Sequence, residues 1–420
     1  MPSVWYIGNA DERAVPFGDQ IFVWRDSNGW SLDESVFTNE QLNTLDADPS
    51  FLLGQNGPRE NPPWTADTSI GRESVYLKQI KGIVDSFGQV KGRRLHAALS
   101  RAYAGTGVCD ILNIGDSVST PYTGASFDFP RSWHRMFKES LIFSGYFDGG
   151  TGIVPCLQGN AQAIDDRITL SGTWNTNNVA YLQAGPGSPI LDFYPNMETS
   201  RIEVHYSNAG AGFEVEVTGQ GEAESVVPDG SPTLGVYART VPNGDHEVQV
   251  TAQEGAIIFN VAAKASSGIR FHNMGKYGMT AQGFLANHNF VRTVVESSMP
   301  NPDALILSCG ANDLTNGRSP AQIVQDLGTI AGMCPTSDLV VCVEPQTTTE
   351  VADAVWESLH QRLIAFARSR GAILVDWHDM FGGRQLINQL GYVGADNKHP
   401  NATAQAAMAA QFKSSIGLLL

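Results

Sequence analysis

The chain has 420 residues, of which 42% are hydrophobic and 17% are charged. That length allows two or three separate hydrophobic cores, because single domains span roughly 100–200 residues. The net charge of −16 at pH 7 argues against nucleic acid and anionic membranes as partners, since both are bound by clustered Lys and Arg.

The amino terminus shows no signal peptide, because residues 1–11 are polar and contain no apolar core segment. No stretch of the sequence is long enough to span a bilayer. We therefore expect a soluble protein that leaves its cell by another route, such as lysis. The five cysteines form no CxxC pair, so we expect buried thiols in a reducing compartment and no zinc ribbon or redox motif.

Residues 1–70 are rich in Trp, Asp, Asn, Gly and Pro, which predicts a small β domain with an aromatic core. Pro62 and Pro63 end this domain, because paired prolines disfavour both a helix and a central strand. In residues 71–104 apolar side chains recur at helical spacing, which predicts a helical connector. A short trimeric coiled coil is an alternative interpretation of the same spacing.

Residues 105–165 open an α/β pattern. The apolar run at 109–114 is typical of a buried parallel strand, and a helix follows around Trp133 and Leu141. Across residues 166–265 apolar and polar side chains alternate, with Asn, Asp and Gly between the runs, which predicts an antiparallel β-sandwich. We expect this sandwich to be inserted into the α/β domain at a surface loop.

Residues 266–420 return to alternating strands and helices. Strands are predicted at 270–274, 304–308, 339–343 and 373–375, and helices at 281–295, 321–333, 351–369 and 402–419. Connections of a dozen or more residues between strands imply parallel pairing, with helices covering the sheet. The expected fold class is therefore α/β, with an inserted antiparallel β-sandwich and a small β-rich N-terminal domain.

Four stretches of glycine and polar residues follow predicted strands or precede the last helix, at the sheet edge where open α/β sheets bind ligands. They are Gly115-Asp116-Ser117, Gly275 to Thr280, Gly310-Ala311-Asn312-Asp313 and Asp396 to His399. A serine hydroxyl becomes a nucleophile when a histidine takes its proton and a carboxylate orients that histidine. Ser117, Asp396 and His399 are therefore the candidate catalytic residues, in a chain order that supports this geometry.

A tetrahedral oxyanion requires hydrogen-bond donors that are already in position. The backbone N–H groups of Ser117 and Gly278 and the side-chain amide of Asn312 are the candidate donors, and Gly275 competes with Gly278. Each stretch also has an ordinary explanation when it is taken alone. A serine after a strand often caps a helix, an Asn-Asp pair favours a turn, and an acidic residue favours a helix start.

Through these four stretches, taken in order, the sequence resembles the SGNH (GDSL-type) hydrolase family over residues 96–165 and 266–420. The resemblance implies a flavodoxin-like three-layer fold and ester hydrolysis without a metal or another cofactor. The long insert between the first two stretches departs from the family's pattern. The implied roles are nucleophile for Ser117, base for His399, its carboxylate for Asp396, oxyanion hole for Ser117, Gly278 and Asn312, and supporting positions for Asp116, Gly310 and Asp313.

The amino-terminal stretches Val4 to Asp11, Gly29 to Leu32 and Phe51 to Gln55 resemble the start of minor tail proteins of actinobacteriophages. This resemblance implies that residues 1–70 attach the protein to a phage tail. It also implies localisation in the virion, after synthesis in the host cytoplasm without a signal peptide. Other phage tail proteins are then expected partners, and a homotrimer is expected by analogy with tails.

We therefore hypothesise a phage-tail serine esterase that hydrolyses acyl or acetyl esters of a host-envelope glycolipid or polysaccharide through an acyl-enzyme. The alternative is a structural or receptor-binding minor tail protein whose hydrolase-like domain and sandwich bind host glycan without turnover. The sandwich itself is either a glycan-binding domain or a spacer that shields the site. The stretch Asp376-Trp377-His378-Asp379 competes as a metal pair or a second dyad, and we interpret it as a polar cluster at a strand end.

Overall fold

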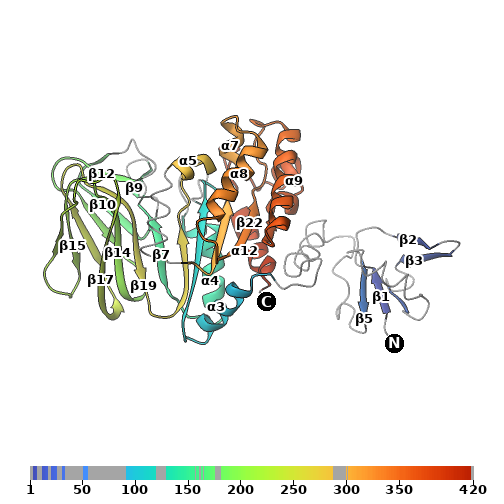
Figure 1. Ribbon diagram of the computed structural model, residues 1–420, viewed down its shortest axis with the longest axis horizontal. Helices are drawn as coiled ribbons and strands as arrows, with labels where there is room; N and C mark the ends of the chain where they lie inside the picture. Colours follow the sequence, from blue (N-terminus) through green and yellow to red (C-terminus); the bar gives the residue numbers. More distant parts are fainter. Residues whose placement is uncertain are drawn as a thin grey trace. The chain divides into compact units, whose positions relative to one another are not determined.

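The computed structural model describes residues 91–119, 130–156, 165–175, 181–286, 299 and 301–417 with their side chains. For 3–6, 12–17, 20–25, 31–33, 51–54, 129, 158–159 and 162–163 it describes the backbone alone. The chain divides into two compact units, Met1–Lys81 and Gly82–Leu420 (Figure 1).

The described part of the first unit consists of short strands: β1 (Ser3–Tyr6), β2 (Glu12–Phe17), β3 (Gln20–Arg25), β4 (Ser31–Asp33) and β5 (Phe51–Gly54). β1 lies between β4 and β5 in an antiparallel sheet, and β2 pairs with β3. The predicted aromatic core of residues 1–70 lies outside the described residues. The predicted connector over 71–104 is described from residue 91 onward, where α3 (Arg93–Tyr103) forms.

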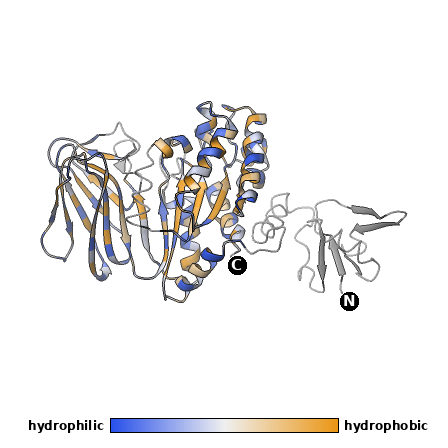
Figure 2. Cartoon of the chain, in the orientation of Figure 1, coloured by the Kyte–Doolittle hydropathy of each residue, from blue (hydrophilic) through white to orange (hydrophobic). Residues whose placement is uncertain are grey.

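The second unit contains a five-stranded parallel sheet in the order β20-β6-β21-β22-β23. All four strand pairs are parallel. The strands are β6 (Val108–Gly115), β20 (Gly268–Asn273), β21 (Ala304–Ser308), β22 (Asp338–Val343) and β23 (Ile373–Asp376). Figure 2 shows that the strands of this sheet are mostly hydrophobic, as expected of a sheet that is covered on both faces. The predicted α/β class with a parallel sheet is confirmed.

Helices cover both faces of the parallel sheet, which gives three layers (Figure 1). Successive residues of β21 separate the two cores, because Leu305 and Leu307 join one hydrophobic cluster and Ala304 and Ile306 join the other. The first cluster is shared with α5 (Ala281–Ala286), α8 (Pro320–Ala331) and α9 (Asp353–Ser369). The second is shared with α3, α4 (Trp133–Phe143) and α12 (Ala402–Ser415).

Shorter helices lie at the strand ends and in the loops: η3 (Phe129–Arg131), α7 (Ala311–Thr315), α10 (Trp377–Met380) and α11 (Gly383–Gln389). The predicted helix over 281–295 is described as far as Ala286, and its remainder lies outside the described residues. Among the helices that the structure describes, none combines the length and the apolar character needed to cross a membrane.

Between α4 and β20 the chain forms two antiparallel sheets that share one hydrophobic cluster. One sheet has the order β10-β13-β18-β15-β16, and the other β11-β12-β19-β14-β17 with β7 beside β19; β8 (Gln158–Gly159) and β9 (Gln162–Ala163) pair separately. Val215 and Val250 of the first sheet and Val204 and Val261 of the second lie in the shared cluster. The strands are β7 (Gly150–Pro155), β10 (Ile168–Ser171), β11 (Trp174–Asn175), β12 (Leu182–Ala184), β13 (Ile190–Phe193), β14 (Glu198–Ser207), β15 (Phe213–Val217), β16 (Glu224–Val226), β17 (Leu234–Asp245), β18 (Val248–Ala252) and β19 (Ile257–Lys264).

β7 joins the antiparallel part to the parallel sheet. It pairs antiparallel with β19, although it precedes residue 166, where the sequence analysis begins the inserted segment. All six of its residues are buried, so it lacks the apolar-polar alternation that marks the other strands. His272 of β20 bridges the two parts: its Nδ1 accepts the N–H of Ile153, and its Nε2 lies 2.9 Å from Asp110 Oδ1 of β6.

Candidate active site

Ser117 lies two residues beyond the end of β6, in a tight turn. The backbone N–H of Ser119 donates to the carbonyl of Asp116 at 3.1 Å, and the N–H of Val118 donates to the Asp116 carboxylate at 2.9 Å. Gly115 is required at the end of β6 because of the side chains around it. A Cβ atom there would lie 2.4 Å from Ser119 Oγ and 2.5 Å from Ser308 Oγ, so a side chain has no room.

The turn before α12 brings His399 and Asp396 to this serine. His399 Nε2 lies 2.8 Å from Ser117 Oγ, and His399 Nδ1 lies 2.5 Å from Asp396 Oδ2. The other carboxylate oxygen of Asp396 accepts the backbone N–H groups of Lys398 at 3.0 Å and His399 at 3.1 Å. These bonds orient the carboxylate. The cap of α12 is Asn401, whose side chain accepts the N–H of Ala404, so neither Asp396 nor His399 serves as that cap.

The electrostatics of Asp396 suit an ionised partner for a histidine. Partial burial opposes its ionisation, but the hydrogen bonds from His399 and from two backbone N–H groups hold the pKa of Asp396 below its usual value. An ionised carboxylate at Nδ1 leaves Nε2 of a neutral imidazole to accept the hydroxyl proton of Ser117. The arrangement can therefore activate the serine for attack on a carbonyl group.

Two glycines compete for one oxyanion position, and their hydrogen bonds separate them. The N–H of Gly275 donates to Asn273 Oδ1 at 2.9 Å. In the described part of the chain, nothing accepts a hydrogen bond from the N–H of Ser117 or of Gly278. The Tyr277 ring lies 5.9 Å from the His399 ring, so the loop with Gly278 borders the histidine. Gly278 is therefore the better donor, and its φ of +69° favours glycine.

Asn312 lies on α7 and connects two of the loops around Ser117. Its side-chain amide donates to Asp116 Oδ2 at 3.2 Å and to the carbonyl of Met279 at 3.1 Å. Both amide hydrogens are thus engaged in this structure, and an oxyanion can be bound by Asn312 when one of these bonds is shared or released.

Asp313 and Gly310 support the same region. The Asp313 carboxylate accepts the backbone N–H groups of Ala281 at 2.8 Å and Gln282 at 3.4 Å, which anchors the start of α5 directly after the Gly278 loop. Gly310 precedes α7 with a φ of +147°, a conformation that residues with a side chain rarely adopt.

Glu344 is a buried acidic residue of this site that the sequence analysis missed. It follows β22 directly, its carboxylate accepts the N–H of Ala311 at 3.1 Å, and its carboxyl group is hydrogen-bonded to Asp116. Burial and the neighbouring Asp116 raise the pKa of Glu344 well above its usual value, and burial raises the pKa of Asp116 to about 6. Folding therefore favours the protonated form of Glu344, which can donate a hydrogen bond to Asp116. Its position after a buried strand was the available signal.

The competing stretch Asp376 to Asp379 lies elsewhere. Asp376 Oδ2 lies 2.8 Å from His360 Nε2 of α9, and Asp376 Oδ1 accepts the N–H of Asp379 at the start of α10. None of the described hydrogen bonds of Asp376 involves Ser117 or His399.

A polar cleft of about 740 Å³ opens beside the carboxylate side of the triad. It is lined on one side by Asp396 and Lys398 and on another by Arg384 and Asn388 of α11. All the residues that line it have polar or charged side chains, whose apolar atoms also form part of the surface, and this suits a hydrated ligand such as a sugar.

One protein family matches part of the chain. Residues 253–407 match the model of the GDSL-like Lipase/Acylhydrolase family, a range that includes Gly278, Asn312, Asp396 and His399 and begins after Ser117. No sequence among the curated proteins matches the chain.

One solved structure shares the fold at low sequence identity, and two others match with lower TM-scores. One, described as "Peptidoglycan O-acetylesterase in action, 5 min", is 18% identical with a TM-score of 0.57, and the match covers 76% of this chain and 93% of that one. A family two carbohydrate esterase from Cellvibrio japonicus is 13% identical with a TM-score of 0.27, over 65% of this chain and 100% of that one. TesA is 23% identical with a TM-score of 0.31, and the match covers 37% of this chain and 81% of that one.

The first of these likenesses bears on the fold, whereas the family match bears on the chemistry. The family match over residues 253–407 supports the predicted resemblance to GDSL-type hydrolases, and the resemblance of the amino terminus to phage tail proteins stays a prediction. Since residues 253–407 match a family of lipases and acylhydrolases, the chain is a carboxylic ester hydrolase.

Proposed function

We propose that this chain is a serine esterase that works through an acyl-enzyme. The observation that carries the proposal is the unbroken set of hydrogen bonds from Asp396 to His399 to Ser117, at 2.5 and 2.8 Å. Ser117 Oγ attacks the ester carbonyl while its proton passes to His399 Nε2. His399 then gives that proton to the leaving alcohol as the ester C–O bond breaks. Water, deprotonated by His399, attacks the acyl-enzyme and releases the acid and Ser117.

The tetrahedral intermediates of both steps carry a negative oxygen. We assign its stabilisation to the N–H groups of Ser117 and Gly278 and the amide of Asn312. The first two have no acceptor among the described residues, which leaves them available to a ligand. Asp116, Gly310 and Asp313 act by positioning, because they hold Asn312 and the start of α5 in place.

The substrate we propose is an acyl or acetyl ester of a host cell-envelope glycolipid or polysaccharide. The polar cleft beside Asp396 supports a sugar-bearing substrate, since hydroxyls and amides hydrogen-bond sugars. A protein of the same fold is described as a peptidoglycan O-acetylesterase, which makes acetylated peptidoglycan the first glycan to test.

We also propose that the protein is part of a phage tail in the virion, with residues 1–70 bound to other tail proteins and the chain assembled as a homotrimer. The support is the sequence of the amino terminus, including Val4 to Asp11 and Phe51 to Gln55. The two antiparallel sheets would then either bind host glycan or hold the active site away from the tail.

The first experiment measures hydrolysis of short-chain nitrophenyl esters and labelling by a fluorophosphonate. Ser117→Ala should lose roughly 10³–10⁶-fold in kcat/KM and all labelling. Ser119→Ala is the matched control, because Ser119 lies in the same turn but hydrogen-bonds Ser308 at 3.1 Å instead of a histidine. Equal rates for the wild type and Ser117→Ala would end the proposal, and glycan binding without turnover would favour a receptor-binding protein.

The second experiment identifies the ester. Host envelope fractions, including acetylated peptidoglycan, are incubated with the wild type and with Ser117→Ala, and the released acids are identified by mass spectrometry. Acid released by the wild type alone names the acyl group. Release from lipid fractions but not from glycans would contradict the polysaccharide substrate and leave the glycolipid.

A further inference from the structure

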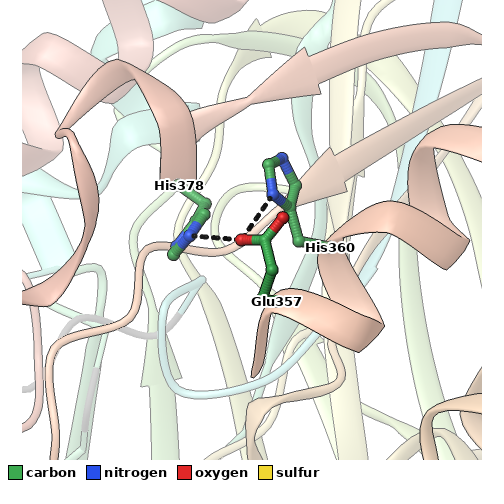
Figure 3. Close-up of side chains that lie close together, drawn as sticks. All are labelled: Glu357, His360 and His378. Carbon is green, nitrogen blue, oxygen red and sulfur yellow. Dashed lines mark hydrogen bonds and ion pairs between the residues drawn. The ribbon is translucent and has the colours of Figure 1, made fainter. Parts of the chain in front are cut away.

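A second cluster of functional side chains lies on the helices α9 and α10, apart from the elements that supply Ser117 and His399. It consists of Glu357 and His360 on α9 and His378 on α10, and Figure 3 shows all three pointing toward one another. One ligand atom from each of these residues lies within 4.8 Å of the other two. The two histidines are buried, whereas the side chain of Glu357 is 53% exposed, so the cluster opens to solvent on one side.

The distances in the cluster are longer than direct charge-assisted hydrogen bonds. Glu357 Oε2 lies 3.5 Å from His360 Nδ1 and 3.9 Å from His378 Nε2. A hydrogen bond between a protonated imidazole and a carboxylate is usually about 2.7–2.9 Å long. In a tetrahedral metal site with bonds of about 2.0–2.2 Å, neighbouring ligand atoms lie about 3.4 Å apart. The 3.5 Å separation is close to such an edge, and the other separations, which reach at most 4.8 Å, would shorten when an ion binds.

Two further side chains orient the ligand atoms from behind. Asp376 Oδ2 lies 2.8 Å from His360 Nε2, so a neutral His360 that donates this N–H turns the lone pair of Nδ1 toward the cluster. Gln361 donates to Glu357 Oε1 at 2.7 Å, which leaves Oε2 as the oxygen that faces both histidines. Metal-binding histidines and carboxylates typically have such partners on their outer atoms.

We propose that Glu357, His360 and His378 bind a divalent transition-metal ion. Two imidazoles and one carboxylate favour Zn²⁺ among the common metals. With Asp376 behind His360, the two carboxylates balance the charge of the ion. Water from the exposed side of Glu357 completes the coordination. The bound ion joins α9 to α10 and so stabilises the edge of the parallel sheet at β23, separately from ester hydrolysis.

The test uses the full chain after treatment with a chelator, and the probe is ZnCl₂ alone. Isothermal titration at neutral pH should give one Zn²⁺ per chain, and the melting temperature should rise with the Zn²⁺ concentration. Glu357→Gln should lose at least about tenfold in affinity and most of the rise. Because Glu357 is exposed, this substitution leaves the fold intact. His378→Asn is the second variant.

Two controls separate this site from other histidines. His96→Asn changes a half-buried histidine of α3, and His399→Ala removes the base of the proposed triad, which is itself able to bind zinc. Both should keep the affinity of the wild type. Absence of Zn²⁺ binding by the wild type, an affinity unchanged by Glu357→Gln and His378→Asn, or a loss of binding in His399→Ala would each overturn the proposal.

Discussion

The amide of Asn312 touches two of the loops that surround Ser117, through the carboxylate of Asp116 and the carbonyl of Met279. Asn312→Ala removes both contacts and the proposed oxyanion donor. We expect kcat for a nitrophenyl ester to fall by roughly 10²–10³ with a smaller change in KM, because the lost bond acts mainly in the transition state.

Asn316→Ala is the control for that variant, since Asn316 is an exposed residue at the end of the same helix. Its kcat should stay close to that of the wild type. A kcat for Asn312→Ala within threefold of this control would remove Asn312 from the oxyanion hole and leave its role as a link between loops.

The buried pair of Asp116 and Glu344 makes a prediction about stability and pH. The pKa of Glu344 is raised in the folded state by burial and by Asp116, so folding favours its protonated form. The stability that this proton provides is present below the usual glutamate pKa and is lost as the pH rises through the raised value. Glu344→Gln keeps a hydrogen-bond donor to Asp116 and removes the titration.

The measurement is the free energy of unfolding in urea for the wild type and Glu344→Gln between about pH 4 and pH 8. As the pH rises, the free energy of unfolding of Glu344→Gln should increase relative to that of the wild type. Parallel curves would show that Glu344 does not titrate differently in the folded and unfolded protein.

At the residue scale, the sequence was informative where a residue type and a strand end coincided. Ser117, Asp396 and His399 could be singled out because their chemistry is recognisable and their order fits. Glu344 has no such partner in the sequence; its role comes from β22 lying beside β21, which brings its carboxylate to Ala311 and Asp116. The need for glycine at 115 depends on side chains from 119 and 308, which local turn chemistry does not reveal.

Among the elements, β7, β6 and β20 meet at one buried histidine. His272 Nδ1 accepts the N–H of Ile153, and its Nε2 bonds to Asp110. Burial opposes ionisation of Asp110, but the bond from His272 and the charge of Arg270 lower the pKa of Asp110 to about 2. The interaction between Asp110 and His272 thus adds an electrostatic contribution to the stability of the paired strands β6 and β20.

This contribution predicts a dependence on acid. The pKa of Asp110 is depressed in the folded state, so its stabilisation of about 2 kcal/mol is present above about pH 4 and is lost as the pH falls toward 2. Asp110→Asn should lower the free energy of unfolding by about that amount at neutral pH, with the difference closing below about pH 3.

Asp245→Asn is the matched control, since Asp245 is exposed on β17. It should leave the free energy of unfolding within about 0.5 kcal/mol of the wild type. A constant difference between Asp110→Asn and the wild type at all pH values would mean that packing, and not the charge, accounts for the loss.

The elements with a clear period were predicted well. The alternating runs near 202–206 and 213–217 correspond to β14 and β15, and the helical spacing over 351–369 corresponds to α9. The sequence analysis did not single out β7, whose six residues are all buried and which pairs with β19. A strand of that kind has no alternation from which its sheet could be inferred.

Taken as a whole, the molecule separates its chemistry from its amino terminus. The parallel sheet, the antiparallel sheets, the Ser117 to His399 pair and the Glu357 cluster all belong to the unit Gly82–Leu420. The order of strands and helices predicted the class of this unit. The spatial order β20-β6-β21-β22-β23 was not predictable, because it depends on crossovers that the sequence leaves open.

This division predicts that a chain beginning at Gly82 keeps its activity on small esters. The three hydrophobic clusters of the described residues all lie within Gly82–Leu420, so this unit has its own cores. We expect kcat/KM of the shortened chain for a nitrophenyl ester to stay within twofold of the value for the full chain. Its melting temperature should stay within a few degrees of that of the full chain. If the first unit attaches the protein to a tail, the shortened chain should be absent from assembled particles although it is active. Loss of small-ester hydrolysis in a folded shortened chain would show that the first unit takes part in catalysis, and would contradict the division.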